Sequence, residues 1–216
     1  MINFEKCEKI FIDFDGVIVD SNQFKELAIE RSIFKVIGKN KTTYAAINFF
    51  NINAGIAREK KLSKFFNHDQ VLNILGTYSK ECHNFFLEAS PTDGIINFLK
   101  FLKGKSKSKK IYILSGGEKD EIVLFLKRNS LSTYFEDILC SDKSKIEHLQ
   151  EKHVSKNDIF IGDSQNDLKA ALETGIQFIL FGQFKSLKSF PSKKLIDNNY
   201  LLKTDNFKSL MKEIKS

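Results

Sequence analysis

Short apolar segments alternate with helical patterns from residue 93 to the end of the chain, and this alternation limits the fold more than any other feature. Strands that alternate with helices form a mostly parallel sheet covered by helices on both faces. We therefore expect an α/β protein. The expected strands are 110–114, 135–140, 159–162, 177–181 and a short one near 200–202, and the expected helices are 94–103, 118–128, 143–152, 167–173 and one from Phe207, with a loop through Pro191.

The segment from Ile10 to Gly16 begins as a buried strand and ends in two aspartates separated by one residue. Because side chains alternate along a strand, Asp13 and Asp15 point the same way if the strand continues, and Gly16 permits a sharp turn. Carboxylates at the C-terminal end of a central strand lie where open α/β sheets bind ligands. Such a pair can hold a divalent cation and still supply an oxygen for nucleophilic attack. The alternative is an acidic turn that closes a strand.

Three later segments also place polar side chains at expected strand or helix ends. Ser115-Gly116-Gly117 offers a hydroxyl and open backbone N–H groups, which suit a phosphate. Lys143 stands just before a helix, and residues 162–167 follow a strand with two aspartates, Asp163 and Asp167. Each segment alone has an ordinary explanation as a turn, a solvated lysine or a helix cap. Their order along the chain, after the first two aspartates, favours a site for phosphoryl chemistry.

These four segments, in this order, resemble the haloacid dehalogenase superfamily, specifically its phosphatase-type members. The resemblance spans most of the chain, from Ile10 to residues 175–179. The segment from Asp163 to Gly175 is similar to phosphoglycolate phosphatases, and Gly55-Ile56-Ala57-Arg58 is similar to the Gly-Val-Ser-Arg of β-phosphoglucomutases. The resemblance implies a Rossmann-like core, at 1–21 and 89–216, with an inserted helical cap at 22–88.

The resemblance also implies a role for each residue of the site. Asp13 would attack phosphorus and form an aspartyl-phosphate, and Asp15 would protonate the leaving oxygen and then activate water. Dehalogenating members lack an aspartate at the position of Asp15, so P–O chemistry is favoured. The phosphoryl group would be bound by Ser115, Gly116 and Lys143, with Lys145 as the alternative lysine. The cofactor would be Mg²⁺, held by the Asp13 carboxylate, the Asp15 backbone carbonyl, Asp163 and, in support, Asp167.

Residues 22–88 interrupt the alternation, since they contain helical patterns and no convincing strand. Such an insertion corresponds to a cap, a lid that excludes water and contacts the part of the substrate that does not react. Arg58 resembles an arginine that reaches the active site in mutase-type relatives, and a guanidinium suits a phosphate or a carboxylate. We expect Arg58, and also Asn22 near the cap hinge, to contact substrate. The neighbours Glu59, Lys60 and Lys61 are expected to be surface charges.

The composition is that of a soluble globular protein of 216 residues, 42% of them apolar, with no long apolar run. The N-terminus lacks the apolar segment of a signal peptide, and the three cysteines form no pair motif, so we expect a cytoplasmic protein that contacts no membrane. The formal charge of +7 includes a lysine cluster at 103–110 that is expected to be a solvated loop. No nucleic-acid motif is present, so no such partner is expected. The oligomeric state is left open.

The leading hypothesis is a Mg²⁺-dependent phosphatase that acts on a small phosphorylated metabolite, either a sugar phosphate or a phosphorylated carboxylic acid. A phosphomutase of the β-phosphoglucomutase type is the alternative enzyme, because nothing in the sequence reveals the lifetime of an aspartyl-phosphate. A binding module without catalytic activity is the third possibility. The joint presence of Asp13, Asp15, Ser115 and Asp163 argues against it.

Overall fold

The computed structural model describes residues 4–53, 56–105, 109–182 and 201–215. Strands in these ranges form one six-stranded sheet in the order β3-β2-β1-β4-β5-β6, and every neighbouring pair is parallel. This confirms the expected α/β class with a Rossmann-like sheet. The loop expected around Pro191 lies outside the described residues. The strands are β1 Lys9–Ile12, β2 Lys110–Leu114, β3 Asp137–Leu139, β4 Ile159–Gly162, β5 Gln177–Phe181 and β6 Leu201–Thr204.

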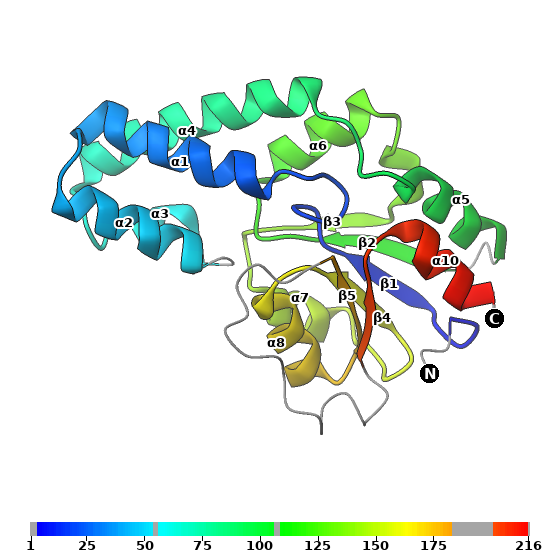
Figure 1. Ribbon diagram of the computed structural model, residues 1–216. Coiled ribbons are helices and arrows are strands. Elements are labelled where there is room, and N and C mark those ends of the chain that lie inside the picture. The colour runs from blue at the N-terminus through cyan, green and yellow to red at the C-terminus, as the bar shows by residue number, and fades with distance from the viewer. Residues whose placement is uncertain (1–3, 54–55, 106–108, 183–200, 216) are drawn as a thin grey trace.

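Helices cover both faces of the sheet (Figure 1), because apolar side chains alternate along its buried strands. On β1, Ile10 and Ile12 belong to one hydrophobic cluster and Phe11 belongs to the other. The first cluster includes side chains of α5 Ile95–Lys105, α6 Lys119–Arg128 and α10 Phe207–Lys215. The second includes side chains of α7 Lys145–Glu151 and α8 Gln165–Thr174. The carboxyl ends of the strands therefore meet at one edge of a three-layered core.

Two helices begin where a capping serine sets their first residue. The Ser144 hydroxyl accepts a hydrogen bond from the Glu147 N–H at 3.2 Å, and the Glu147 side chain accepts one from the Ser144 N–H at 2.7 Å. This capping box starts α7 at Lys145 and not at residue 143. Ser164 caps α8 in the same way, so that helix begins at Gln165. Strand β3 is shorter than the expected 135–140, and residues 132–134 ahead of it form a 3₁₀ turn.

The chain from Asn22 to Glu88 forms a lobe of helices on the side where the strands end, and we call this lobe the cap (Figure 1). Its described residues contain no strand, as expected. The cap and the core share one hydrophobic cluster. The ring of Phe14, between the two aspartates, lies 5.5 Å from that of Phe86 in the cap and 5.3 Å from that of Phe125 in α6. The cap helices are α1 Asn22–Ile37, α2 Lys41–Ile52, α3 Arg58–Leu62 and α4 His68–Glu88.

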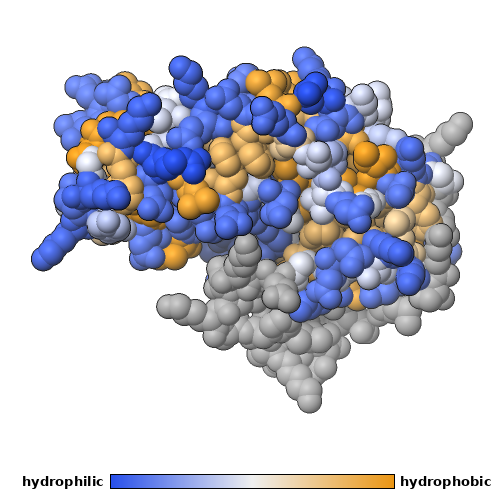
Figure 2. Space-filling view, turned by 45° about the horizontal axis from the view of Figure 1, so that its top comes forward, coloured by the Kyte–Doolittle hydropathy of each residue, from blue (hydrophilic) through white to orange (hydrophobic). Residues whose placement is uncertain are grey.

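The surface is mainly hydrophilic over the face that Figure 2 shows, and apolar side chains there form small separate groups. No helix in the described ranges has both the length and the apolar character of a membrane span. One lysine of the 103–110 cluster is not solvated, contrary to expectation. Lys109 is buried and donates hydrogen bonds to the carbonyls of Phe4 and Cys7 at 2.6 Å each, so it fastens the N-terminal segment beside β2.

Candidate active site

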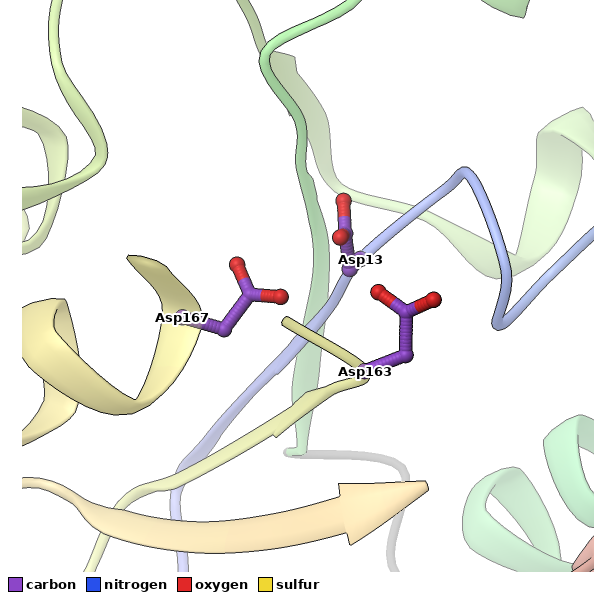
Figure 3. Close-up of side chains that lie close together, drawn as sticks. All are labelled: Asp13, Asp163 and Asp167. Carbon is purple, nitrogen blue, oxygen red and sulfur yellow. The ribbon is translucent and has the colours of Figure 1, made fainter. Parts of the chain in front are cut away.

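Three carboxylates face one another at the carboxyl ends of β1 and β4 (Figure 3). Asp13 follows β1, Asp163 follows β4, and Asp167 lies in the first turn of α8. One oxygen from each lies within 4.8 Å of the others. Carboxylate oxygens are the ligands that Mg²⁺ prefers in proteins. The structure thus brings together three of the residues that were expected to hold the metal.

The local chain holds these carboxylates close together. The Asp13 N–H donates to the Ile161 carbonyl at 2.8 Å, which extends the pairing of β1 with β4 up to the first aspartate. Asp167 Oδ2 accepts hydrogen bonds from the Ser164 N–H and hydroxyl, at 3.0 and 2.6 Å. Gly16 has a φ of +79°, and a side chain there would collide with the Asp163 carboxylate. The approach of Asp163 to this turn therefore requires glycine.

Lys145, and not Lys143, is the lysine at the site. Its Nζ lies 3.0 Å from Asp13 Oδ1 and 2.5 Å from Asp167 Oδ1. The position expected for Lys143 was wrong, because its side chain is 43% exposed and pairs with Glu151 at 2.6 Å. The physical reason is the capping box at Ser144, which leaves Lys143 ahead of α7 and makes Lys145 the first residue of that helix.

The acidic cluster has more negative charge than Lys145 neutralises. Burial, and then the charge of Asp167, raise the pKa of Asp13 well above its ordinary value, against the opposing effect of Lys145. Burial and Asp167 also raise the pKa of Asp163 to about 7. The Asn22 amide opposes this shift by donating to Asp163 Oδ2 at 2.6 Å. A bound divalent cation would favour the ionised carboxylates, so the donor set fits Mg²⁺.

Asp15 makes its contacts with the start of the cap. The Lys25 ammonium lies 2.7 Å from both Asp15 carboxylate oxygens, and the Ser21 hydroxyl donates to Oδ1 at 2.5 Å. Burial raises the pKa of Asp15, but Lys25 and Ser21 outweigh it and hold that pKa below its ordinary value. The Asp15 side chain is therefore an ionised carboxylate engaged by an ammonium, outside the three-aspartate cluster.

The segment after β2 brings a hydroxyl and two glycines to the same edge of the sheet. Ser115 is buried, and its Oγ accepts a hydrogen bond from the Gly117 N–H at 3.0 Å. A Cβ on Gly117 would lie 3.2 Å from Ser115 Oγ and 3.4 Å from Asp15 Oδ2, so these groups converge on one place. Ser115 and Gly116 thus lie where the sequence placed them, and their binding of phosphate stays a prediction.

Arg58 extends from the cap to the site, and there it pairs with a carboxylate of the core, that of Glu121. Its Nη1 and Nη2 donate to Glu121 Oε1 and Oε2 at 2.7 and 2.8 Å. The guanidinium also lies 4.8 Å from the centre of the Tyr78 ring. Glu121 Oε2 is 3.5 Å from Lys25 Nζ as well. In this structure Arg58 therefore ties α3 of the cap to α6 of the core, and its contact with substrate stays a prediction.

A cavity of about 460 Å³ lies between the cap and the sheet edge. Its core wall includes Asp13, Asp163 and Lys145, and its cap wall includes Arg58 and Lys61. The expectation that Lys61 is a surface charge was wrong, because only 6% of this residue is exposed. Packing of α3 against α2 and α4 buries it, which no neighbouring residue in the sequence indicates.

Sequence reasoning missed three charged residues that bear on this cavity. Lys25 lines the cavity one helical turn after Ser21, and Glu121 lies in the first turn of α6, where an acidic residue is common. Lys61 follows three other charged residues in a short helix. None of them stands in a motif, so the packing of the cap on the core is what distinguishes them from solvated charges.

The fold and the site together define an α/β protein whose acidic centre lies at the carboxyl edge of a parallel sheet, beneath a helical cap. Residues 10–181 match the family of haloacid dehalogenase-like hydrolases. The chain belongs to this family, which confirms the resemblance seen in the sequence. Among curated protein sequences, none matches the chain.

Several solved structures share the fold over nearly the whole chain. A haloacid dehalogenase-like hydrolase from Streptococcus pneumoniae is 21% identical with a TM-score of 0.65, over 96% of this chain and 99% of that one. A predicted phosphoglycolate phosphatase from Haemophilus somnus is 15% identical with a TM-score of 0.72, over 96% and 97%. A β-phosphoglucomutase from Clostridium difficile is 19% identical with a TM-score of 0.69, over 94% and 93%. At these identities the likeness shows the fold alone.

Proposed function

We propose that this hydrolase is a Mg²⁺-dependent phosphatase that acts on a small phosphorylated metabolite, a sugar phosphate or a phosphorylated carboxylic acid, through an aspartyl-phosphate on Asp13. The main support is the environment of Asp13. Its Oδ1 accepts a hydrogen bond from the Phe14 N–H at 2.8 Å and lies 3.0 Å from Lys145 Nζ. Because both contacts involve Oδ1, the other oxygen is better suited to attack phosphorus.

The proposed reaction has two steps. In the first, an Asp13 oxygen attacks phosphorus, the bond from phosphorus to the ester oxygen breaks, and Asp15 gives that oxygen a proton. In the second, water attacks the same phosphorus and gives a proton to Asp15, and the bond to Asp13 breaks. The ionised Asp15 seen beside Lys25 suits the second step. The first step requires a protonated Asp15, so Lys25 must move away and the Asp15 carboxylate must take up a proton from solvent before it can act as an acid.

The remaining residues of the core wall would neutralise the phosphoryl group. Mg²⁺ held by Asp13, Asp163 and Asp167 would offset the repulsion between an anionic nucleophile and a phosphate dianion. The Ser115 hydroxyl, the N–H groups after it and the Lys145 ammonium are the groups suited to bind phosphoryl oxygens. A cytoplasmic location and the absence of a nucleic-acid partner stay predictions.

A phosphomutase is the second candidate, because the cap wall has cations that suit the second phosphate of a sugar bisphosphate. A mutase keeps its aspartyl-phosphate from water while the intermediate turns around. It would transfer a phosphoryl group from a sugar bisphosphate to a sugar monophosphate and release little free phosphate.

The test is phosphate release from p-nitrophenyl phosphate and from a panel of phosphorylated metabolites, with Mg²⁺ and with EDTA. We expect release that needs the metal, and a metabolite that is turned over with a higher kcat/KM than the aryl phosphate. Absence of hydrolysis and of phosphoryl transfer across the panel, with folded protein and Mg²⁺ present, would contradict the proposed function.

A further inference from the structure

The cap wall of the cavity contains three cations, and two of them already face carboxylates. Lys25 contacts Asp15 at 2.7 Å, and Arg58 pairs with both oxygens of Glu121. Lys61 differs from both. In the described parts of the chain its Nζ contacts the Phe50 carbonyl at 3.1 Å and the Phe50 ring at 3.5 Å, and no carboxylate lies within ion-pairing distance. Lys61 is thus a buried cation with neutral partners only.

The surroundings of Lys61 make a buried ammonium unfavourable. Burial, followed by the charges of Arg58 and Lys25, lowers the pKa of Lys61 to about 8. The carbonyl and the ring of Phe50 offset part of the desolvation cost. Near pH 7 the ammonium form still prevails. An anion that entered this part of the cavity would be attracted by the Lys61 ammonium, which forms no ion pair with a carboxylate in the described part of the chain.

We propose that Lys61 binds a second anionic group of the substrate, so that the natural substrate is a phosphate monoester that also carries a carboxylate or another phosphate. This inference rests on the proposed function and names the substrate class that the cap selects. It also divides the work of the cap. Arg58, paired with Glu121, holds α3 against α6, while Lys61 supplies a positive charge in the cavity that pairs with no carboxylate of the described residues.

A purely structural role is the competing explanation. The Phe50 carbonyl belongs to the last turn of α2, and an ammonium near the C-terminal end of a helix is stabilising. A lysine with only this role would, when replaced, lower the melting temperature and affect all substrates alike. A residue that selects the second anion would raise KM for doubly anionic substrates and leave a simple aryl phosphate unchanged.

The experiment compares three variants of the full chain. Lys61→Gln keeps a hydrogen-bond donor for the Phe50 carbonyl and removes the charge, and Lys61→Arg keeps the charge. Lys60→Gln removes a neighbouring charge from the same helix, where Lys60 is exposed, and serves as the matched control. The substrates are 2-phosphoglycolate, 3-phosphoglycerate and fructose 1,6-bisphosphate, which carry a second anion, and p-nitrophenyl phosphate, which does not.

We expect the wild type to prefer at least one doubly anionic substrate. For that substrate Lys61→Gln should raise KM about ten- to a hundred-fold, the usual effect of losing a charge-assisted hydrogen bond, with little change for p-nitrophenyl phosphate. Lys61→Arg should keep most of the preference, and Lys60→Gln all of it. A rise in KM for the phosphorylated carboxylic acids would identify the second anion as a carboxylate, and a rise for the bisphosphate would identify it as a phosphate. Lys61→Met, which removes the charge and suits an apolar site, replaces the glutamine variant if that variant does not fold.

Two results would overturn the inference while leaving the proposed function intact. One is a wild type that hydrolyses p-nitrophenyl phosphate and shows no preference for any doubly anionic substrate. The other is an equal change, or no change, for both kinds of substrate in Lys61→Gln. A wild type that releases no phosphate even from the aryl phosphate would instead contradict the proposed function.

Discussion

The two walls of the cavity differ in how their charges are paired. On the core wall, Asp13, Asp163 and Asp167 share a single ammonium, that of Lys145. On the cap wall, where Glu26 also lies, Lys25 and Arg58 pair with Asp15 and Glu121, and among the described residues no carboxylate lies within ion-pairing distance of Lys61. The core wall is therefore suited to a metal cation, and the cap wall to an anion. Burial disfavours both the crowded carboxylates and the Lys61 ammonium, and a metal cation or an anionic group from solution would give each of them an opposite charge.

The largest expected effect concerns the core wall. Asp13→Asn keeps the shape of the side chain and removes the attacking oxygen, so turnover should fall at least about a thousand-fold. The same change removes one of three crowded charges, so the melting temperature should stay the same or rise. Phosphate release and thermal unfolding measure the two effects. Asp120→Asn, on the exposed start of α6, is the control.

Substantial activity in Asp13→Asn would exclude the aspartyl-phosphate. In the wild type, beryllofluoride with Mg²⁺ should form a phosphoryl mimic on Asp13, which can be detected as protection against thermal unfolding. The asparagine variant should show no such protection.

The second prediction separates metal binding from proton transfer. Asp163→Asn weakens the acidic cluster, so raised Mg²⁺ should restore part of its activity. Asp15→Asn should lose about a hundred- to ten-thousand-fold in turnover, and raised Mg²⁺ should not restore it, because a general acid–base is missing. The measurement is kcat as a function of Mg²⁺ concentration. Equal rescue of both variants would mean that these two roles are wrongly divided.

The third prediction concerns the buried ion pair between Arg58 of the cap and Glu121 of the core. Arg58 and Glu121 side chains are 10% and 8% exposed, so Arg58→Met leaves a buried carboxylate with only Lys25 nearby. We expect a loss of roughly 3 kcal/mol and a fall in melting temperature of roughly 6–12 °C. Arg31→Met breaks a pair in which Arg31 is 50% exposed, and should cost less than about 1 kcal/mol. Equal losses in both variants would show that burial does not distinguish the two pairs.

The smallest expected effect is a pH dependence at Lys61. The pKa of about 8 predicts that kcat/KM for a doubly anionic substrate falls as pH rises through 8, since the neutral amine binds anions poorly. Lys61→Arg should abolish this decline. Burial raises the pKa values of Tyr78 and Cys82 on α4, so neither loses its proton between pH 7 and 9. The other charged groups on this side of the cavity are Lys25 and Glu26 on α1, Arg58 on α3 and Glu121 on α6.

The same shift predicts a stability effect with a definite sign. The folded pKa of Lys61 is below its ordinary value of 10.5, so between about pH 8 and 10.5 the unfolded chain binds more protons than the folded protein. The free energy of unfolding should therefore rise with pH in this window, relative to Lys61→Gln. A pH-independent difference between wild type and variant would mean that Lys61 is not titrating there.

The alternation of strands and helices was enough to predict the sheet and its class, because each buried strand and its following helix leave a local apolar pattern. The same holds for the aspartates and Ser115, which stand at strand ends. Lys143 shows the limit of this reasoning. The first apolar residue of the expected helix, Ile146, suggests that Lys143 has the position of the phosphate-binding lysine. The Ser144–Glu147 capping box, however, sets where α7 begins. That box is readable in the sequence and would have favoured Lys145.

The contacts between the cap and the core could not be predicted from the sequence, for a different reason. Arg58 and Glu121 are 63 positions apart, and nothing local to either residue indicates that they pair. Lys61 and the exposed Lys60 are neighbours in one short helix, and only tertiary packing makes one buried and the other solvated. Tertiary packing therefore decides which charges line the cap side of the cavity, whereas local motifs indicate the residues of the core side.

The position of Phe14 has a mechanical consequence for the cap. This residue separates the two aspartates in the chain, and its ring packs on Phe86 of α4 and Phe125 of α6. A motion that separated α4 from α6 would have to break at least one of these ring contacts, and it would strain the backbone between Asp13 and Asp15. In the proposed mechanism, an opening of the cap for product release would therefore also disturb the alignment of the groups that react.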